Sequence, residues 1–443
     1  MSRIGVFGAG YVGLVTAACL AELGHDVVVR DVVPAKIDRL KRGEMPIFEP
    51  GLDELLAKNE ERLTFTLDAS EAVLGADFVF VCVDTPPVPY SGDADLSRVW
   101  TVVEELPNVE GRPVLVMKST VPVGTGEKVR AALDQRGLEH VGYVSNPEFT
   151  AEGRAIRDFM EPDRVVVGAF DEEHAERIAG LYAELDGPIV RMDVHSAEMV
   201  KLASNAFLMT RISFINEIAN VCEATGADVV KVAEGVGLDQ RLGPHFLRAG
   251  VGWGGSCFPK DSLALKQLAA NSGYHFQLLN AVIEVNELQK RRVIGKLQRH
   301  LGKLRGKRIA LLGLAFKAGT DDTREAPSLV LASRLIAEGA EVCAWDPVVD
   351  GAALLPQAQF CSTVQDAVRG ADAAVIVTEW DELRDLARPE IRDLMAGPLI
   401  VDGRNLLDPA QVRAAGFAYE GIGRPVSPSD VLAETPERDP KVV

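Results

Sequence analysis

Short apolar runs alternate with amphipathic stretches in the first part of the chain. The apolar runs predict buried strands at 3–7, 26–30, 77–83, 114–117 and 141–144. Between the first two runs, apolar residues at helical spacing predict a helix over 14–23. Strands that are apolar throughout are typical of parallel sheets covered by helices on both faces. The pattern therefore predicts a doubly wound α/β domain.

The same alternation returns after residue 307. Strands are expected at 308–313, 341–345, 373–378 and 399–402, with a helix over 327–338. The intervening segment predicts helices over roughly 196–300, beginning with a long helix that Ser196 would cap. We expect an α/β protein with two Rossmann-like doubly wound domains, at 1–195 and 301–443, joined by a long central helix and a helical dimerisation region at 196–300.

The composition limits the kinds of partner that the protein is expected to bind. The 443 residues carry a net charge of −18, which argues against binding nucleic acid or an anionic membrane surface. No apolar run approaches the ~18 residues of a membrane span, and the chain opens with a strand-like segment instead of a signal peptide. Six dispersed cysteines without metal-ligand spacing indicate no metal site and a reducing cytoplasm. Residues 436–441 are expected to lie in a solvated tail.

A glycine motif follows the first strand. Gly8, Gly10 and Gly13 form G-x-G-x-x-G between the strand and the helix. Gly8 permits the tight turn, Gly10 leaves room for a pyrophosphate, and Gly13 lets the helix pack on the strand. Asp31 ends the second strand, where a carboxylate can hold a ribose diol. Its charge would repel a 2′-phosphate, so the sequence favours NAD over NADP; an exposed strand-end aspartate is the alternative.

Polar residues follow three other predicted strands. Thr85 and Thr120 would lie at carboxyl strand ends, where doubly wound sheets bind ligands, although both could be simple turn caps. Glu148 and Glu152 follow the strand at 141–144. If their segment is helical, this spacing places both carboxylates on one face, where they could share a site or be two solvated glutamates.

Two stretches carry candidate catalytic groups. Lys201 and Asn205 lie one turn apart on the long helix, where they could bind a sugar hydroxyl or an oxyanion, or face solvent. Cys257 lies in a glycine-rich loop that Lys260 and Asp261 follow. The glycines would let a ligand approach the backbone, and Lys260 could favour a thiolate. A packed cysteine in a simple turn is the alternative.

Basic residues suggest a second nucleotide. Arg241 and Arg248 precede the cysteine loop, and guanidinium groups suit diphosphates. The second α/β domain lacks G-x-G-x-x-G, so it is suited to a nucleotide other than the cofactor, with Lys317 and Arg404 as candidate contacts. All four residues could equally be ordinary surface charges.

Together these segments resemble the UDP-glucose/GDP-mannose dehydrogenase family over nearly the whole chain. The motifs that carry the resemblance are Gly8 to Gly13, 46–52 (PIFEPGL), 146–149 (NPEF), Lys201 to Asn205, 254–261 (GGSCFPKD), and Phe316-Lys317 with 320–324 (TDDTR). The resemblance implies two successive hydride transfers to NAD that oxidise the 6-hydroxyl of UDP-glucose to the carboxylate of UDP-glucuronate. GDP-mannose or a UDP-N-acetylhexosamine remains an alternative substrate, and a catalytically silent nucleotide-sugar sensor is an alternative function.

The resemblance also implies residue roles. Cys257 would capture the aldehyde as a thiohemiacetal and then carry a thioester, because sulfur adds readily to aldehydes and leaves readily from acyl groups. Lys201, Asn205 and Asp261 would assist proton removal and stabilise the oxyanion, while Glu148 would activate the hydrolytic water and Thr120 would position it. Homodimers through the central helix are expected.

The binding residues implied by the resemblance form two groups. Those on the cofactor side are Gly8, Ala9, Gly10, Tyr11, Val12, Gly13, Asp31, Lys36, Thr85, Thr120, Glu152, Lys260 and Arg324. Those on the substrate side are Glu148, Phe149, Thr150, Ala151, Glu152, Lys201, Asn205, Arg241, Arg248, Ala249, Gly250, Val251, Gly252, Gly254, Lys317 and Arg404.

Overall fold

The computed structural model describes residues 1–427 and residue 430, and these form two compact units. The first unit comprises Met1–Asn205 and Lys260–Phe276, and the second begins with Ala206–Pro259 and resumes at Gln277. The expected solvated tail at 436–441 lies outside the described residues. The three-domain division at 195 and 300 stays a prediction.

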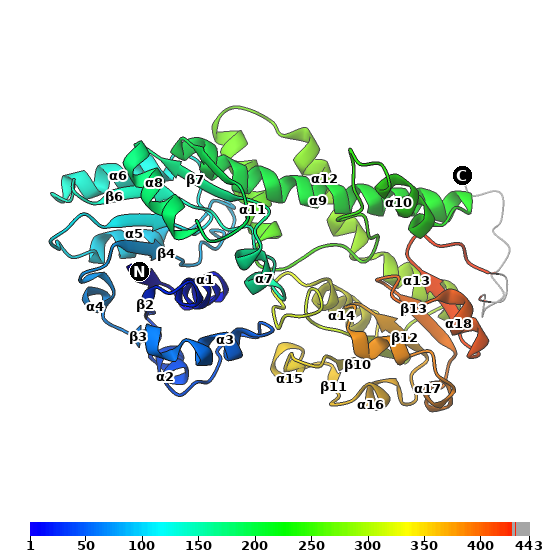
Figure 1. Cartoon of the computed structure of the whole chain (residues 1–443). Helices are drawn as coiled ribbons and strands as arrows, with labels where there is room; N and C mark the ends of the chain where they lie inside the picture. The colour runs from blue at the N-terminus through cyan, green and yellow to red at the C-terminus, as the bar shows by residue number, and fades with distance from the viewer. Residues whose placement is uncertain (428–429, 431–443) are drawn as a thin grey trace. The chain divides into compact units, whose positions relative to one another are not determined.

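An eight-stranded sheet forms the centre of the first unit (Figure 1). Its strands are β1 (Arg3–Phe7), β2 (Asp26–Arg30), β3 (Leu63–Thr66), β4 (Phe78–Val81), β5 (Val114–Met117), β6 (Gly142–Ser145), β7 (Val165–Ala169) and β8 (Ile189–Met192). They are ordered β3-β2-β1-β4-β5-β6-β7-β8, and all neighbours are parallel except β6 and β7. The reversal at β7 adds an antiparallel extension to a doubly wound sheet.

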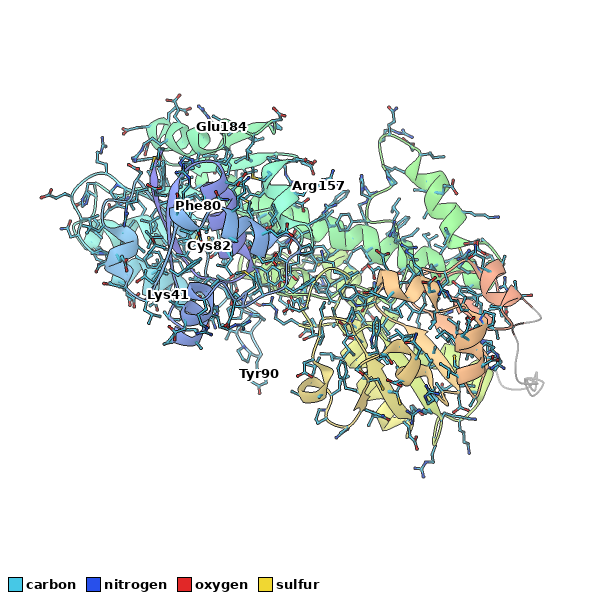
Figure 2. All side chains as sticks on the ribbon, turned by 60° about the horizontal axis from the view of Figure 1, so that its bottom comes forward. Lys41, Phe80, Cys82, Tyr90, Arg157 and Glu184 are labelled. Carbon is cyan, nitrogen blue, oxygen red and sulfur yellow. The ribbon has the colours of Figure 1, made fainter. Side chains whose placement is uncertain are left out.

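Helices cover this sheet and complete two apolar cores. They are α1 (Tyr11–Glu22), α2 (Pro34–Lys41), α3 (Leu52–Lys58), α4 (Ala69–Val73), α5 (Ser97–Glu105), α6 (Thr125–Gln135), α7 (Ala155–Met160) and α8 (Glu172–Leu181), with a 3-10 turn at Glu60–Arg62. Residues of β4 alternate between the cores: Phe78 and Phe80 pack in one, Val79 and Val81 in the other, and Cys82, which follows the strand, packs with Phe80. Figure 2 shows Phe80 and Cys82 within this unit, whereas Tyr90 projects from its surface.

The second unit contains a six-stranded parallel sheet (Figure 1). Its strands are β9 (Arg308–Leu312), β10 (Glu341–Trp345), β11 (Gln359–Phe360), β12 (Ala373–Ile376), β13 (Leu399–Asp402) and β14 (Ala418–Gly421). The order β11-β10-β9-β12-β13-β14 repeats the order of the first six strands of the first unit. Its helices are α14 (Pro327–Ala337), α15 (Gly351–Leu354), α16 (Val364–Val368), α17 (Pro389–Leu394) and α18 (Pro409–Ala414), with a 3-10 turn at Asp381–Asp385. The expected fold class, two Rossmann-like domains and a long helix, is confirmed.

The first turn of each sheet is built in the same way. Gly8 and Gly313 both have positive φ, 106° and 97°, which favours glycine, and each donates its N–H to the last carbonyl of the second strand at 2.8 Å. An aspartate follows that strand in each unit. Asp31 accepts a hydrogen bond from Ala9 N, and Asp346 accepts one from Leu314 N, both at 2.7 Å. The two halves therefore share a local architecture that periodicity alone did not reveal.

The long helix α9 (Val194–Thr225) has 32 residues, and the division into units falls between Asn205 and Ala206. The expected cap at Ser196 is wrong: Ser196 lies inside the first turn, and its N–H and hydroxyl both donate to the carboxylate of Asp193. Asp193 lies before the helix and accepts a hydrogen bond from an N–H group of its first turn. It therefore caps the helix in place of Ser196. The other helices of this region are α10 (Val229–Gly237), α11 (Phe258–Asn271), α12 (Gln277–Gln289) and α13 (Arg292–Leu301).

No helix of residues 1–427 is both long and apolar enough to span a membrane. Within the same described part of the chain, no group of three or more His, Cys, Asp or Glu side chains could hold a metal ion.

Candidate active site

The glycine turn after β1 has room where a pyrophosphate would approach. A Cβ atom on Gly10 would meet no atom within 4 Å, whereas one on Gly13 would lie 1.8 Å from the Gly8 carbonyl oxygen. The open space is therefore next to Gly10, at the N-terminus of α1, where backbone N–H groups favour an anion. Gly13 is required for packing between the helix and the turn. These residues fit the diphosphate of a dinucleotide.

Asp31 is fixed beside this turn. Its carboxylate accepts hydrogen bonds from Ala9 N (2.7 Å), Val33 N (3.0 Å) and the Lys36 ammonium (3.1 Å). Burial would raise the pKa of Asp31, but these donors lower it below its usual value. The ionised carboxylate keeps acceptor capacity for hydroxyl groups, which suits a ribose diol.

Glu148 and Lys201 form a buried ion pair in the first unit. Lys201 Nζ lies 2.8 Å from Glu148 Oε1, and the two side chains are 4% and 6% exposed. Glu148 Oε2 accepts hydrogen bonds from the backbone and hydroxyl of Thr150, both at 2.7 Å. Burial would raise the pKa of Glu148, but Lys201 and Thr150 lower it to about 2. Glu148 is therefore an ionised carboxylate that could accept a proton from a bound hydroxyl or water.

A second group links α9 to α11 within the same unit. Asn205 donates to Asp261 Oδ2 at 2.6 Å, and Lys260 donates to Asp261 Oδ1 at 2.6 Å. Asn205 and Asp261 are both buried. Lys201 and Asn205 thus use the same side of α9 for two different carboxylates, as their spacing predicted.

Thr85 and Thr120 come together at the carboxyl ends of their strands. The Thr85 hydroxyl donates to the Thr120 carbonyl oxygen at 2.8 Å. Both line a small cavity of the first unit, whose other lining residues are Pro87, Ala94, Val121, Pro122, Leu202, Lys260, Asp261 and Ala264. The cavity brings together a hydroxyl-bearing turn, α9 and the start of α11.

The segment 146–152 is not helical, because α7 begins only at Ala155. The condition under which Glu148 and Glu152 would share a helix face is therefore not met. Pro147 disfavours a helical conformation at Asn146, and Glu148 instead folds back onto the Thr150 N–H. Glu148 is buried, whereas Glu152 is only partly buried.

Three contributors to this region were missed from the sequence. Glu49 accepts hydrogen bonds from Gly153 N (2.6 Å) and Ala155 N (2.7 Å), which fixes the loop that bears Glu152. Glu198 accepts from Gly124 N and Gly126 N, both at 2.7 Å, and thereby ties α9 to the turn after Thr120. The spacing of Glu198 from Lys201 and Asn205 along one helix face was the available signal.

Arg164 is the third contributor. Its guanidinium carbon lies 3.7 Å from the centre of the Phe149 ring, and the Lys201 ammonium lies 5.6 Å from the same ring. The predicted substrate residue Phe149 is thus held by two cations. No spacing rule linked Arg164 to Phe149, because the two belong to separate loops.

The cysteine loop lies in the second unit up to Pro259. Asn286 accepts a hydrogen bond from Trp253 N (2.8 Å) and donates one to Trp253 O (3.0 Å). A Cβ on Gly254 would lie 2.3 Å from the Glu325 carbonyl oxygen, and one on Gly255, whose φ is 87°, would meet the Phe316 ring at 2.9 Å. These glycines therefore serve close packing of the loop.

Cys257 differs from the other cysteines. All six are free thiols within the described residues, and Cys257 alone among them is not buried. Burial raises the pKa of both Cys19 and Cys82 to about 12. The Ser256 hydroxyl lies 3.5 Å from the Cys257 sulfur. Of the six thiols, Cys257 is best placed to act as a nucleophile.

The predicted basic residues of the second unit have different surroundings. Arg404 donates to the carbonyls of Val377 (2.7 Å), Gly252 (3.2 Å) and Phe316 (2.9 Å), so it organises the cysteine loop. Arg324 pairs with Asp322, the Lys317 ammonium lies 5.4 Å from the Phe316 ring centre, and Arg241 is exposed and paired with Asp239. Arg248 is exposed as well.

Asp346 shows why the second unit differs from the first. Its carboxylate accepts from Leu314 N, Ala315 N, Val348 N, Val349 N and the Trp380 indole. Five donors fill the roughly four lone-pair positions of a carboxylate. The position that Asp31 occupies in the first unit is therefore purely structural in the second.

Three family models of the UDP-glucose/GDP-mannose dehydrogenase family match consecutive parts of the chain. The NAD binding domain matches residues 2–186, the central domain 195–288 and the UDP binding domain 310–409.

Individual proteins agree with this assignment. The chain is 45% identical to UDP-glucose 6-dehydrogenase TuaD of Bacillus subtilis, with 97% of this chain and 96% of that protein covered. It is 46% identical to a UDP-glucose 6-dehydrogenase of Pseudomonas aeruginosa, with 96% and 98% covered. Among solved structures, a UDP-glucose dehydrogenase from Pyrobaculum islandicum has a TM-score of 0.88 at 39% identity, covering 96% of this chain and 98% of its own. These matches confirm the resemblance seen in the motifs: the chain belongs to the UDP-glucose/GDP-mannose dehydrogenase family.

Proposed function

We propose that the protein is a UDP-glucose 6-dehydrogenase that oxidises the 6-hydroxyl of UDP-glucose to a carboxylate in two steps. Relatives with that name are about 45% identical over nearly the full length of both chains. The observation that carries the proposal is the partly exposed thiol of Cys257, since the other five cysteines are all buried. A covalent sulfur adduct lets one chain complete both oxidations before the product leaves.

The dinucleotide would bind the glycine turn of the first unit. We propose contacts from Gly8 to Gly13, Asp31 and Lys36, with Thr85, Thr120, Glu152, Lys260 and Arg324 on the cofactor side. The space beside Gly10 and the ionised Asp31 support the first part of this set. NAD, when bound, supplies the hydride acceptor for both oxidations.

In the first oxidation the 6-hydroxyl oxygen loses a proton and C6 loses a hydride, and the resulting aldehyde carbon is attacked by the Cys257 thiolate. The new carbon–sulfur bond and one added proton give a thiohemiacetal. We propose that Lys201 and Asn205 stabilise the oxygen during these changes and that Asp261, directly or through water, accepts a proton. The buried hydrogen bond from Asn205 to Asp261 supports a shared role.

In the second oxidation the thiohemiacetal loses its hydroxyl proton and a hydride, which leaves a thioester on Cys257. Water then adds to the acyl carbon, the carbon–sulfur bond breaks, and the carboxylic acid and the thiol are released. We propose that Glu148 takes the proton of this water and that Thr120 positions it. Glu148 is ionised, so its carboxylate can accept a hydrogen bond from this water.

The nucleotide sugar would bind the residues that the family resemblance implies. We propose substrate contacts from 148–152, Lys201, Asn205, Arg241, Arg248 to Gly252, Gly254, Lys317 and Arg404. The match of 310–409 to a UDP binding domain supports uridine diphosphate as the nucleotide. The aromatic ring of Phe149, which lies near both Arg164 and Lys201, supports a fixed sugar-side surface.

We propose a homodimer that forms through α9. The part of α9 that belongs to the second unit exposes three apolar side chains, Phe207 (64% exposed), Phe214 (54%) and Val221 (57%). They repeat every seven residues along one side of the helix. Such a continuous apolar stripe is typical of a subunit interface. We also propose the cytoplasm as the compartment, supported by six free thiols in the described residues.

A second substrate class has an observation in its favour. A UDP-D-ManNAc dehydrogenase from Pyrococcus horikoshii has a TM-score of 0.85 at 31% identity, covering 95% of this chain and 99% of its own. A panel of UDP-glucose, UDP-N-acetylmannosamine and GDP-mannose would separate the substrates. We expect the highest kcat/KM with UDP-glucose, and a higher value with either other sugar nucleotide would contradict that assignment.

The number of NADH molecules formed per sugar tests the reaction itself. Two NADH and one UDP-glucuronate are expected for each UDP-glucose consumed. Cys257→Ser should retain nucleotide-sugar binding while steady turnover falls about a thousandfold or more. One NADH per sugar with free aldehyde as product, or near-normal turnover of the serine variant, would refute the sulfur-bound route.

A further inference from the structure

Lys118 is a buried lysine to which the mechanism above gives no role. It follows β5 and is 5% exposed. Its ammonium donates to Asn146 Oδ1 (3.0 Å) and to the Tyr182 hydroxyl (3.3 Å), and it lies 5.8 Å from the ring centre of Phe159. Burying an ammonium is costly unless its partners compensate, so a purely structural requirement here would be met more easily by an apolar side chain.

The partner of Lys118 is rigidly placed. Asn146 is fully buried, and its Oδ1 also accepts from the Tyr182 hydroxyl at 2.6 Å. Its Nδ2 donates to the Val166 carbonyl at 2.8 Å, and its backbone N–H donates to the Met117 carbonyl at 2.9 Å. Asn146 is therefore held by residues of β5 and β7, by Lys118 after β5 and by Tyr182 at the end of α8. Among the hydrogen-bond partners of the Asn146 side chain in residues 1–427, Lys118 is the one charged group.

Asn146 begins the turn that bears Glu148. Only Pro147 separates the two residues, and the ring of Pro147 restricts the backbone between them. The direction of the Glu148 side chain, with Lys201 on one oxygen and Thr150 on the other, therefore depends on where Asn146 is anchored.

Charge also connects Lys118 to Glu148. The titratable groups that act on Lys118 are Cys82, Glu148, Lys201 and Cys19, and burial lowers the pKa of Lys118 to about 8. Burial keeps both thiols neutral near neutral pH, since their pKa values are raised to about 12. Glu148 is thus the one anion of this set, and it is attracted to Lys118 as well as to Lys201.

We propose that Lys118 is a positioning residue for hydrolysis of the thioester: through Asn146 it holds the 146–148 turn, and with it the Glu148 carboxylate, in the geometry that activates water. This inference rests on the proposed function. Glu148 takes the proton of the hydrolytic water in the last step of the reaction. The inference therefore assigns Lys118 to that step and gives it no part in the two oxidations.

Replacement by an apolar side chain of similar length tests the assignment. With Lys118→Met, both oxidations should proceed and yield a burst of about two NADH per subunit, followed by a steady rate about ten- to a hundredfold below wild type. KM values for UDP-glucose and NAD should change by less than about threefold. Mass spectrometry after the burst should find the sugar acyl group on Cys257.

Hydroxylamine distinguishes a positioning role of Lys118 in hydrolysis from a purely structural role. It attacks a thioester without needing a general base, forming a hydroxamate and freeing the thiol. It should therefore restore the steady rate of Lys118→Met several-fold while leaving the wild-type rate nearly unchanged. Lys128→Met, which removes an exposed lysine of α6, is the matched control and should behave as wild type in every assay.

Tyr182→Phe removes one of the two donors to Asn146 Oδ1 while retaining the ring, so it tests the same link if Lys118→Met does not fold. We expect a full burst and a steady rate about two- to fivefold lower. Burst and steady rate falling together, or a steady rate that is unchanged, would overturn the role of Lys118. A wild-type protein that forms one NADH per sugar would instead overturn the proposed function, and this inference with it.

Discussion

Gly10 and Gly13 are neighbours in one motif but have different physical tasks. A methyl group at Gly10 meets open space, whereas at Gly13 it collides with the Gly8 carbonyl oxygen. We predict that Gly10→Ala keeps the thermal midpoint within a few degrees of wild type and raises the KM for NAD about tenfold, or ~1.4 kcal/mol. Its φ of −94° suits alanine, so only the ligand should be affected.

Gly13→Ala provides the contrast for that experiment. The added Cβ clashes with a backbone oxygen, and no side-chain rotation can relieve that clash, so the variant should lose several degrees in thermal midpoint even without cofactor. If Gly10→Ala were destabilised as strongly, or bound NAD as wild type does, the space beside Gly10 would not be the pyrophosphate site.

The ion pair of Glu148 with Lys201 should make stability depend on pH. The folded pKa of Glu148 is lowered from 4.5 to about 2, so its contribution is complete above pH 4.5 and is lost as the pH falls toward about 2. We predict that Glu148→Gln costs about 3–5 kcal/mol of unfolding free energy at about pH 7, because Lys201 is left buried without its partner.

Urea unfolding at several pH values would measure this effect. The gap between Glu148→Gln and wild type should narrow steadily below about pH 4.5. Glu44→Gln is the control: this carboxylate is 52% exposed beside Arg42, and its replacement should leave the urea midpoint nearly unchanged at every pH. A gap that stays constant or widens on acidification would contradict the lowered pKa.

At the scale of strands and helices, the pattern of apolar residues predicted most central strands of both sheets but missed the strands at their edges. The strands β1, β2, β5, β10 and β13 have the expected bounds. The strands β3, β8 and β11 were missed, because each is short and partly exposed and so lacks a continuous apolar run. β7 is apolar but was not identified, and β14 contains Glu420, a buried acid that interrupts the pattern.

The apolar stripe of α9 leads to a prediction about assembly. Phe214→Glu places a charge within the stripe of Phe207, Phe214 and Val221, where dimer formation would bury it without a partner. We predict that sedimentation detects monomers for this variant at concentrations where the wild-type protein is dimeric. Leu74→Glu is the control, since Leu74 is 69% exposed and lies outside the stripe; it should not change the mass. A dimeric Phe214→Glu variant would show that the interface lies elsewhere.

Each unit of the molecule has its own apolar core, so each should respond to its own ligand. A ligand that binds only the folded state stabilises the unit that holds its site. We predict that NAD protects the amides of β1 and β2 from hydrogen exchange, whereas UDP protects those of β9 and β12. NADP is the control and should protect neither set as strongly as NAD does, because Asp31 repels a 2′-phosphate. Protection of β9 by NAD alone would reverse the assignment of the ligands.

The candidate site could be predicted only in part from the sequence. The glycine motif, Asp31, and the Lys201–Asn205 spacing depend on local geometry, which periodicity captures. The bonds from Lys201 to Glu148 and from Asn205 to Asp261 join residues more than fifty positions apart, and no spacing rule pairs them. The burial of each group and the donors that surround it together set its protonation state; both follow from the fold and could not be inferred from residue type.

The carboxylate of Asp346 has consequences for the order of events in catalysis. Its five hydrogen-bond donors leave it little capacity to accept hydrogen bonds from a ribose. Of the two similar sheets, the first therefore offers a dinucleotide-binding site and the second does not. The proposed oxidation removes four electrons, so it would have to use that one dinucleotide-binding site twice. In the proposed reaction, the reduced dinucleotide must leave and an oxidised one must bind while the sugar is bonded to Cys257, so the lifetime of that bond limits how slow cofactor exchange can be.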